Sequence, residues 1–121
     1  MPREERTRVQ LPSHVQLAWP VLVVLRRSPG GLTNREMELE VGVEAGLSDE
    51  QRSVLRTATS RSRTLLDYRL AWTRTMLKGM GAIINDAPAH WVVTDQGRLT
   101  TEADIRAEAD RMISNIGSGQ R

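Results

Sequence analysis

The sequence predicts a mainly α-helical fold with one small β-hairpin, a winged helix-turn-helix with an extra C-terminal helix. The first observation is an amphipathic helical pattern over residues 64–79. The second is a pair of apolar runs, 82–84 and 91–93, which follow that pattern directly and flank the polar residues 85–90, as in a β-hairpin. The third is a series of capping signals that start shorter helices earlier in the chain. A helix that leads directly into a hairpin is typical of winged helices.

Length and composition limit the class of protein. The 121 residues suffice for one domain with one modest core. The chain has no cysteine, which excludes disulfides and thiolate metal sites and fits a reducing cytosol, so we expect a cytoplasmic protein. No apolar run is long enough for a signal peptide or a bilayer span, so we expect no membrane contact. We divide the chain into a flexible arm at 1–12, a winged-helix domain at 13–98, a C-terminal helix at 99–116 and a flexible tail at 117–121.

The first helix is expected to begin at a capping box formed by Ser13 and Gln16. Pro20 lies inside its pattern and either kinks the helix or marks the start of its regular part. The Pro/Gly turn at 28–31 ends it. Its apolar stripe comprises Leu17, Val21, Val24 and Leu25.

The second helix is expected to follow a very short strand at 31–32 and to begin at a capping box of Thr33 and Glu36. Its inner side carries Met37, Val41 and Leu47, and its outer side carries Glu38, Glu40 and Glu44. Because acidic side chains repel phosphate, this helix is expected to support the fold behind the amphipathic helix at 64–79.

A third capping box, Ser48 with Gln51, starts a short helix that carries Arg52. The Ser/Thr-rich stretch 57–62 is then expected to be a loop that leads into the central helix. Hydroxyl groups and arginines in such a loop are common phosphate contacts, and they are also ordinary loop residues.

The central helix has one apolar stripe and one outer face. The stripe comprises Leu66, Leu70, Thr73, Leu77 and Met80, at spacings of four, three, four and three. The outer face comprises Tyr68, Ala71, Thr75 and Lys78. Gly79 and Gly81 can end the helix, because glycine adopts the left-handed conformation at little steric cost.

After the hairpin, residues 94–98 are expected to close the second strand. Thr101 and Asp104 then give a capping signal for the final helix. The apolar stripe of that helix comprises Ile105, Ala109, Met112 and Ile116. Such a stripe packs either on the core of the domain or on a second subunit, so a homodimer contact through 101–116 stays open.

The basic residues are concentrated in one segment. Residues 52–78 hold seven basic side chains and one acid, a net charge of +6, whereas the rest of the chain carries −4. This asymmetry indicates a local anion-binding surface, with a merely solvated basic face as the alternative.

The sequence argues against catalysis. No cluster of carboxylates accompanies its two histidines, His14 and His90, so we expect no metal site. Lys78 is the only lysine, so the Asp…Glu-x-Lys arrangement of restriction-type nucleases cannot be assembled. A phosphate-binding glycine loop is also absent from the sequence. We therefore expect no catalytic residue and no cofactor, and predict that the chain is not an enzyme.

Candidate DNA contacts follow from the outer face and from the loop before it. We expect Arg61 and Arg63 to contact phosphates, with Arg74 and Lys78 holding the backbone at the flanks of the face. The side chains at the centre of the face would meet base edges, with plain solvent exposure as the alternative. The candidate set is Arg56, Arg61, Arg63, Thr64, Tyr68, Ala71, Arg74, Thr75 and Lys78. Arg56 is a weaker member of this set, and Arg52 is a weaker candidate outside it.

Three other residues of this region are expected to have structural roles. Arg69 lies near the apolar stripe, so we expect it to form an ion pair with an acid such as Asp67 or Glu44. Trp72 and Trp91 are expected to be core anchors and not stacking platforms.

Four segments carry a family pattern in their residues and order: 46–52, 65–72, 77–83 and 91–98. The most specific parts are Arg69-x-x-Trp72 in the central helix and Thr94-x-x-Gly97-Arg98 after the hairpin. Together they resemble the amino-terminal domain of Mrr-type restriction endonucleases, over a stretch from about residue 20 to residue 98.

The resemblance implies a winged helix that recognises DNA and that, in the full enzymes, precedes a nuclease domain cutting modified DNA. No nuclease domain is present in this sequence, so the resemblance implies a non-catalytic module that binds double-stranded DNA, modified or not. It carries over no preference for methylated bases, because no residue here is typical of a methylcytosine pocket. The turn 85–90 has no Arg or Lys and contains Asp86, so we place the affinity in the central helix and its preceding loop. The alternative is a winged helix that binds protein or regulates transcription, with the acidic second helix and the final helix as contacts.

Overall fold

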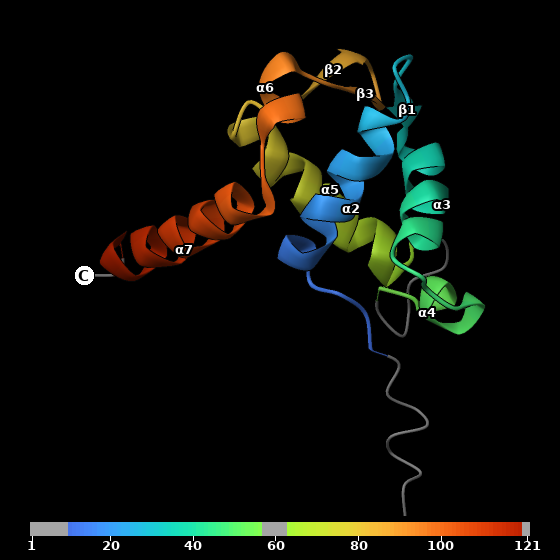
Figure 1. Ribbon diagram of the computed structural model, residues 1–121. Coiled ribbons are helices and arrows are strands. Elements are labelled where there is room, and N and C mark those ends of the chain that lie inside the picture. The colour runs from blue at the N-terminus through green and yellow to red at the C-terminus, as the bar shows by residue number, and fades with distance from the viewer. Residues whose placement is uncertain (1–9, 57–62, 120–121) are drawn as a thin grey trace, which may run out of the picture.

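The computed structural model describes residues 10–56 and 63–119, the side chains of 115–119 excepted. Within these ranges the chain forms mainly helices with a small antiparallel sheet of three strands, as expected for a winged-helix-like fold (Figure 1). The elements are α2 (His14–Arg26), β1 (Leu32–Thr33), α3 (Asn34–Glu44), α4 (Asp49–Ser53), α5 (Leu65–Gly79), β2 (Ile83–Ala87), β3 (His90–Val93), α6 (Asp95–Leu99) and α7 (Glu102–Gly119). The central helix therefore leads directly into the hairpin, as predicted.

Helix α2 is the centre of the hydrophobic core. It contacts α3, α5, α7 and β3, which surround it (Figure 1). Pro20 lies inside the helix, so the regular part of the helix begins before the proline. The buried side of α2 comprises Leu17, Ala18, Val21, Leu22, Val24 and Leu25, which confirms the predicted stripe.

The predicted capping boxes are confirmed. In each, the N-cap hydroxyl accepts a hydrogen bond from a backbone N–H three residues later, and the side chain there accepts one from the N-cap N–H. The pairs are Ser13 with Gln16, Thr33 with Glu36 and Ser48 with Gln51, and Thr101 makes the same exchange with Asp104 before α7. These helix starts are therefore specified by neighbouring residues and could be predicted without tertiary information.

Strand β3 lies between β1 and β2, and Leu32 of β1 pairs with Trp91 of β3. The hairpin turn is tighter than predicted. Strand β2 extends to Ala87 and β3 begins at His90, so residues 85–87 and His90, which are predicted to lie in the turn, belong to the strands. This is possible because β2 is an edge strand whose residues are exposed after the first one, and exposed positions accept polar side chains.

Residues 95–99 form the short helix α6, which corrects the strand ending predicted there. Thr94 is the N-cap, and its hydroxyl accepts a hydrogen bond from the Gly97 N–H at 2.9 Å. The prediction was wrong because the sequence alone does not distinguish a threonine that ends a strand from a threonine that caps a helix. At the other end of α6, the Arg26 guanidinium donates to the carbonyls of Gly97 and Thr100. These bonds satisfy acceptors that the end of a helix leaves unpaired.

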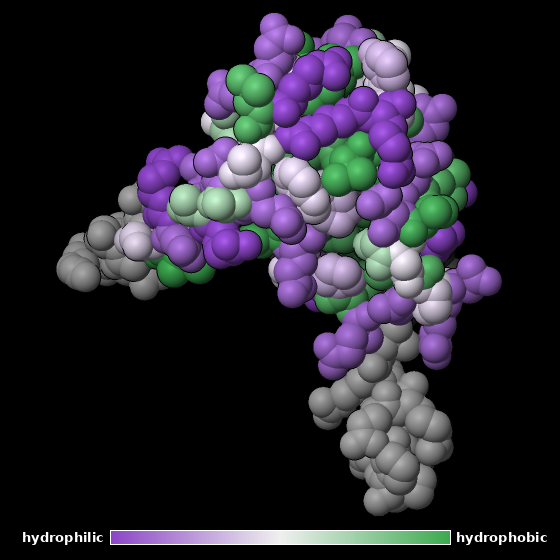
Figure 2. All heavy atoms as spheres, in the orientation of Figure 1, coloured by the Kyte–Doolittle hydropathy of each residue, from purple (hydrophilic) through white to green (hydrophobic). Residues whose placement is uncertain are grey.

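Helix α7 packs on α2 through its first half and then projects from the body of the molecule (Figure 1). Ile105 and Ala109 are buried and Met112 is partly buried against the core, which confirms core packing of the described stripe. Ile113 is 68% exposed. The visible surface of this helix is mostly hydrophilic, with a few separate apolar groups (Figure 2). The side chain of Ile116 lies outside the described residues, and the homodimer contact stays a prediction.

Candidate nucleic-acid interface

Helix α5 buries one side and exposes the other as its spacing predicts. Leu66, Leu70, Thr73 and Leu77 are fully buried, and the Thr73 hydroxyl donates to the His14 carbonyl of α2 at 2.7 Å. On the outer face Thr75 and Lys78 are exposed, and Tyr68 and Ala71 are half-buried. The helix ends at Gly79, and Gly81 has the left-handed φ of 80° that favours glycine. The predicted outer face therefore exists as a surface.

Thr64 is the N-cap of α5, and its hydroxyl accepts a hydrogen bond from the Asp67 N–H at 3.0 Å. The same hydroxyl donates to Glu38 of α3 at 2.9 Å. Glu38 is thus turned towards α5, which corrects its predicted outward position, whereas Glu40 and Glu44 are exposed as expected. Thr64 fastens the start of the central helix to the supporting helix.

The chain on both sides of residues 57–62 is paired. The Arg56 N–H donates to the Arg63 carbonyl at 2.9 Å, and the Leu65 N–H donates to the Val54 carbonyl at 2.8 Å. Arg61, one of the predicted phosphate contacts, lies outside the described residues. This backbone pairing places the side chains of Arg56 and Arg63 at the start of α5.

Arg56 and Arg63 converge on Tyr68. Their guanidinium carbons lie 4.6 and 5.6 Å from the centroid of the Tyr68 ring. Arg63 Nε also forms an ion pair with Asp67 Oδ2 at 3.0 Å. A hydrogen bond with the Trp72 side chain, and a further one with Arg56, lower the pKa of the Tyr68 phenol, because they favour negative charge on its oxygen. The start of the outer face is therefore an electropositive surface built around one aromatic ring.

Arg74 is a correction, because we expected it at the edge of the outer face, holding the DNA backbone. It is only 5% exposed, and its guanidinium lies against Met37 Sδ at 3.8 Å and 5.9 Å from the centroid of the Trp91 ring. Burial lowers the pKa of Arg74. Arg74 lies at the border between the buried and the outer face of α5, and α3 and β3 cover it there. The spacing of residues within one helix does not reveal which neighbouring elements cover its borders. Arg74 holds α5 against its neighbours and is removed from the set of phosphate contacts.

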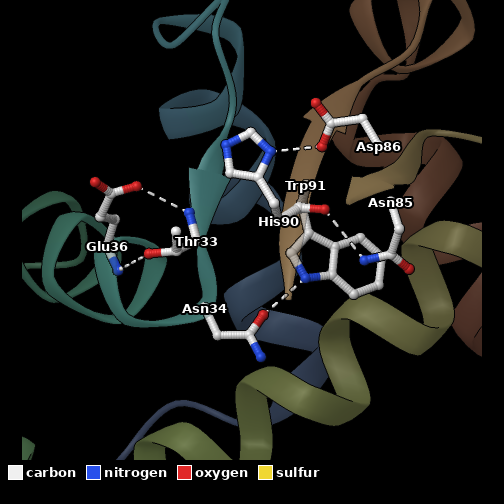
Figure 3. A network of polar contacts seen from close by, with 7 residues as sticks. All are labelled: Thr33, Asn34, Glu36, Asn85, Asp86, His90 and Trp91. Atoms are coloured by element: carbon white, nitrogen blue, oxygen red, sulfur yellow. Dashed lines mark hydrogen bonds and ion pairs between the residues drawn. The ribbon is translucent and has the colours of Figure 1, made fainter. Parts of the chain in front are cut away.

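Lys78 lies between the end of α5 and the hairpin. Its Nζ donates to Asn85 Oδ1 at 3.4 Å and lies 5.9 Å from the centroid of the Trp91 ring. The Trp91 indole N–H in turn donates to Asn34 Oδ1 of α3 at 2.8 Å (Figure 3). Trp91 packs against the core, as predicted, and joins the hairpin to both helices.

The hairpin carries a negative charge and no Arg or Lys. Asp86 and the His90 imidazole form a pair near its tip, and Asn85 Nδ2 donates to the His90 carbonyl at 3.2 Å (Figure 3). The hydrogen bond with His90 lowers the pKa of Asp86. The hairpin is therefore ordered by its own polar contacts, and its charge does not favour phosphate.

The structure overturns two predicted structural roles. Arg69 Nη1 donates to the carbonyls of Leu11 and Pro12 at 2.9 and 3.0 Å, and so ties the start of the described chain to α5 where we predicted an ion pair. Trp72 is 53% exposed and is not a core anchor. Both residues lie towards the start of α2 and towards α7, where the neighbouring elements leave the side of α5 partly open.

Arg52 is partly withdrawn from the surface. Its side chain lies over Gly42 of α3, where an added Cβ would come within 2.8 Å of its Nε atom. That nitrogen is buried and makes no hydrogen bond to a described residue. Arg52 thus packs against α3 and stays a weaker candidate for a contact with DNA.

Two further findings concern the described part of the chain only. It contains no group of three or more His, Cys, Asp or Glu side chains that could hold a metal ion. It also contains no helix long and apolar enough to cross a membrane.

Comparison with known proteins shows to which family the chain belongs. The model of the Mrr N-terminal domain matches residues 14–103, which include every element from α2 to α6. Searches of curated proteins and of solved structures gave no match. The matched stretch contains the Arg69-x-x-Trp72 and Thr94-x-x-Gly97-Arg98 motifs and covers most of the chain. The chain therefore belongs to the Mrr N-terminal domain family.

Proposed function

We propose that this chain is a non-catalytic DNA-binding domain that reads double-stranded DNA through the outer face of α5. The observation that carries the proposal is the placement of cations at both ends of that face. Arg56 and Arg63 lie at its start and Lys78 at its end. A helix of 15 residues is about 22 Å long, and an α-helix fits the major groove of B-DNA. Cations so spaced suit phosphates on the two borders of the groove.

Affinity and sequence preference are assigned to different side chains. Arg56, Arg63 and Lys78 would contact phosphates, and Arg61 stays with them, whereas the Thr64 hydroxyl already donates to Glu38. Tyr68, Ala71 and Thr75 would face the base edges. Ala71 permits close approach. The Thr75 hydroxyl donates to the Ala71 carbonyl at 3.0 Å and can accept a hydrogen bond from a base.

Membership of the Mrr N-terminal domain family supports an association with restriction. The family model describes the amino-terminal domain and not a nuclease, which agrees with a role in recognition. The proposal therefore includes DNA carrying modified bases among the ligands, and the binding experiment needs a methylated copy of each duplex.

Charge reversal at the start of α5 tests the proposal. We expect Arg56→Glu/Arg63→Glu to reduce affinity for a mixed-sequence duplex at least about 100-fold, since two phosphate contacts become repulsive. Arg98→Glu/Arg106→Glu, on α6 and α7, changes the net charge equally and serves as the matched control. Fluorescence anisotropy measures both affinities, and circular dichroism checks that each variant is folded. Equal losses in the two variants would contradict α5 as the DNA-binding element.

The alternative, a protein-binding winged helix, has its own supporting observation. Leu39 and Val43 on the outer side of α3 are 50% and 68% exposed, beside Glu40. In that case the Arg56→Glu/Arg63→Glu variant would retain its partner, and substitutions of Leu39 and Val43 would remove it.

A further inference from the structure

A groove of about 740 Å³ runs beside α5, between the start of α2 and α7. Its apolar lining includes Leu11, Trp72 and Met112, and its polar lining includes His14 and Arg69. Ligand pockets in proteins range from about 300 to 1,000 Å³ and combine apolar walls with a few polar groups, as this groove does. The groove adjoins the outer face of α5 because Tyr68 also lines it.

Trp72 presents a large aromatic surface at this groove. The residue is 53% exposed and, like Tyr68 one turn earlier in α5, it lines the groove. Arg69 donates to the carbonyls of Leu11 and Pro12 and so fixes the part of the wall that Leu11 forms. An exposed aromatic side chain thus lies beside a wall that hydrogen bonds hold in place.

The charges around the groove select the class of ligand. No carboxylate is among the described residues that line it, whereas Arg69 does, and Arg56 and Arg63 lie over the Tyr68 ring at its border. A flat aromatic group with a negatively charged tail therefore complements the groove. In a nucleic acid, that group is a base that has left the helical stack.

We propose that the groove binds one unpaired nucleobase, stacked on the Trp72 indole, with the adjoining phosphates held by Arg56 and Arg63. Stacking on an aromatic side chain is available to every base, because every base has a π-face. The site would give the domain a preference for DNA with locally unpaired bases over fully paired DNA. This inference rests on the proposed DNA binding and adds a second mode of contact to it.

The test compares two probes of equal length and sequence context, a paired duplex and the same duplex with a three-nucleotide mismatched bubble. We expect the wild-type chain to bind the bubble at least about tenfold more tightly. Trp72→Ala should remove this preference and leave affinity for the paired duplex within about twofold, whereas Trp72→Phe should retain most of it. Leu99→Ala, which removes another exposed apolar side chain, is the matched control and should change neither affinity.

Equal binding of the two probes by the wild-type chain would overturn the inference while leaving the proposed function in place. A change of oligomeric state in Trp72→Ala, measured by sedimentation, would also overturn it, because the groove would then be covered by a second copy. If the paired duplex is not bound but the bubble is bound in a Trp72-dependent way, the proposed function fails and the nucleobase site stands. Thermal unfolding of each variant excludes misfolding as the cause.

Discussion

Arg26 shows how one side chain can hold distant parts of this domain together. Its guanidinium donates to the carbonyls of Gly97 and Thr100, which lie more than 70 residues further along the chain, and stacks 4.9 Å from the centroid of the Trp19 ring. Hydrogen bonds from a charged donor stabilise more than neutral ones do, and these bonds are partly buried.

We expect Arg26→Ala to lower the free energy of unfolding by about 2–3 kcal/mol, because two helix-end carbonyls lose their donor. The neighbouring Arg27 is the matched control, since it forms an exposed ion pair with Glu44 at 2.8 Å and such pairs contribute at most about 1 kcal/mol. Urea denaturation followed by circular dichroism measures both. Similar losses in the two variants would contradict the role given to Arg26.

Gly97 is required by close packing. A Cβ there would lie 2.0 Å from the Ala82 carbonyl oxygen and 2.7 Å from Val93 Cγ2. The backbone of Ala82 cannot move aside as the end of a flexible side chain can. We therefore expect Gly97→Ala to lower the free energy of unfolding by about 3 kcal/mol or more. Gly79→Ala is the control, since no atom beyond its chain neighbours and its own helix backbone lies within 4 Å of the added Cβ, and it should change stability by less than about 1 kcal/mol. A Gly97→Ala domain as stable as the control would contradict the close approach of α6 to the sheet.

At the scale of the element, the sequence predicted those features of a helix that depend only on residues close to one another in the chain. The capping boxes and the buried stripe of α5 follow from spacing within one helix. Arg74 and Trp72 were placed wrongly because both lie at the borders of the α5 faces, where other elements decide exposure. Arg74 is covered by α3 and β3, whereas Trp72 faces the open side towards α7. The exposure of the α5 side chains was therefore predicted at the centre of the outer face and missed at its borders.

The β2–β3 hairpin gives a prediction about pH. Since the hydrogen bond with His90 lowers the pKa of Asp86 in the folded state, the ionised carboxylate stabilises the fold above the unfolded pKa. That contribution is lost as the pH falls through the lowered folded pKa, in the range below about pH 4. In a carboxyl NMR titration, His90→Ala should raise the pKa of Asp86 towards its ordinary value. An unchanged titration would contradict the pairing.

At the scale of the whole molecule, the proposed function rests on an uneven distribution of charge. The chain carries a net charge of only +2, yet the segment 52–78 carries +6. Folding buries Arg74 and packs Arg52 on α3, and it brings Arg56 and Arg63 together at one end of α5 with Lys78 at the other. The sequence predicted the basic segment, and the fold decides which of its cations reach the surface.

The salt dependence of duplex binding tests the central claim most directly. If cations on α5 bind phosphates, the logarithm of the affinity falls linearly with the logarithm of salt concentration. The Arg56→Ala/Arg63→Ala variant should show a slope shallower by about 2, since each contact contributes about 0.9. A methylated duplex measured in parallel reports any preference for modified DNA. A salt-independent affinity, or the same slope in the variant, would contradict DNA recognition by the outer face of α5.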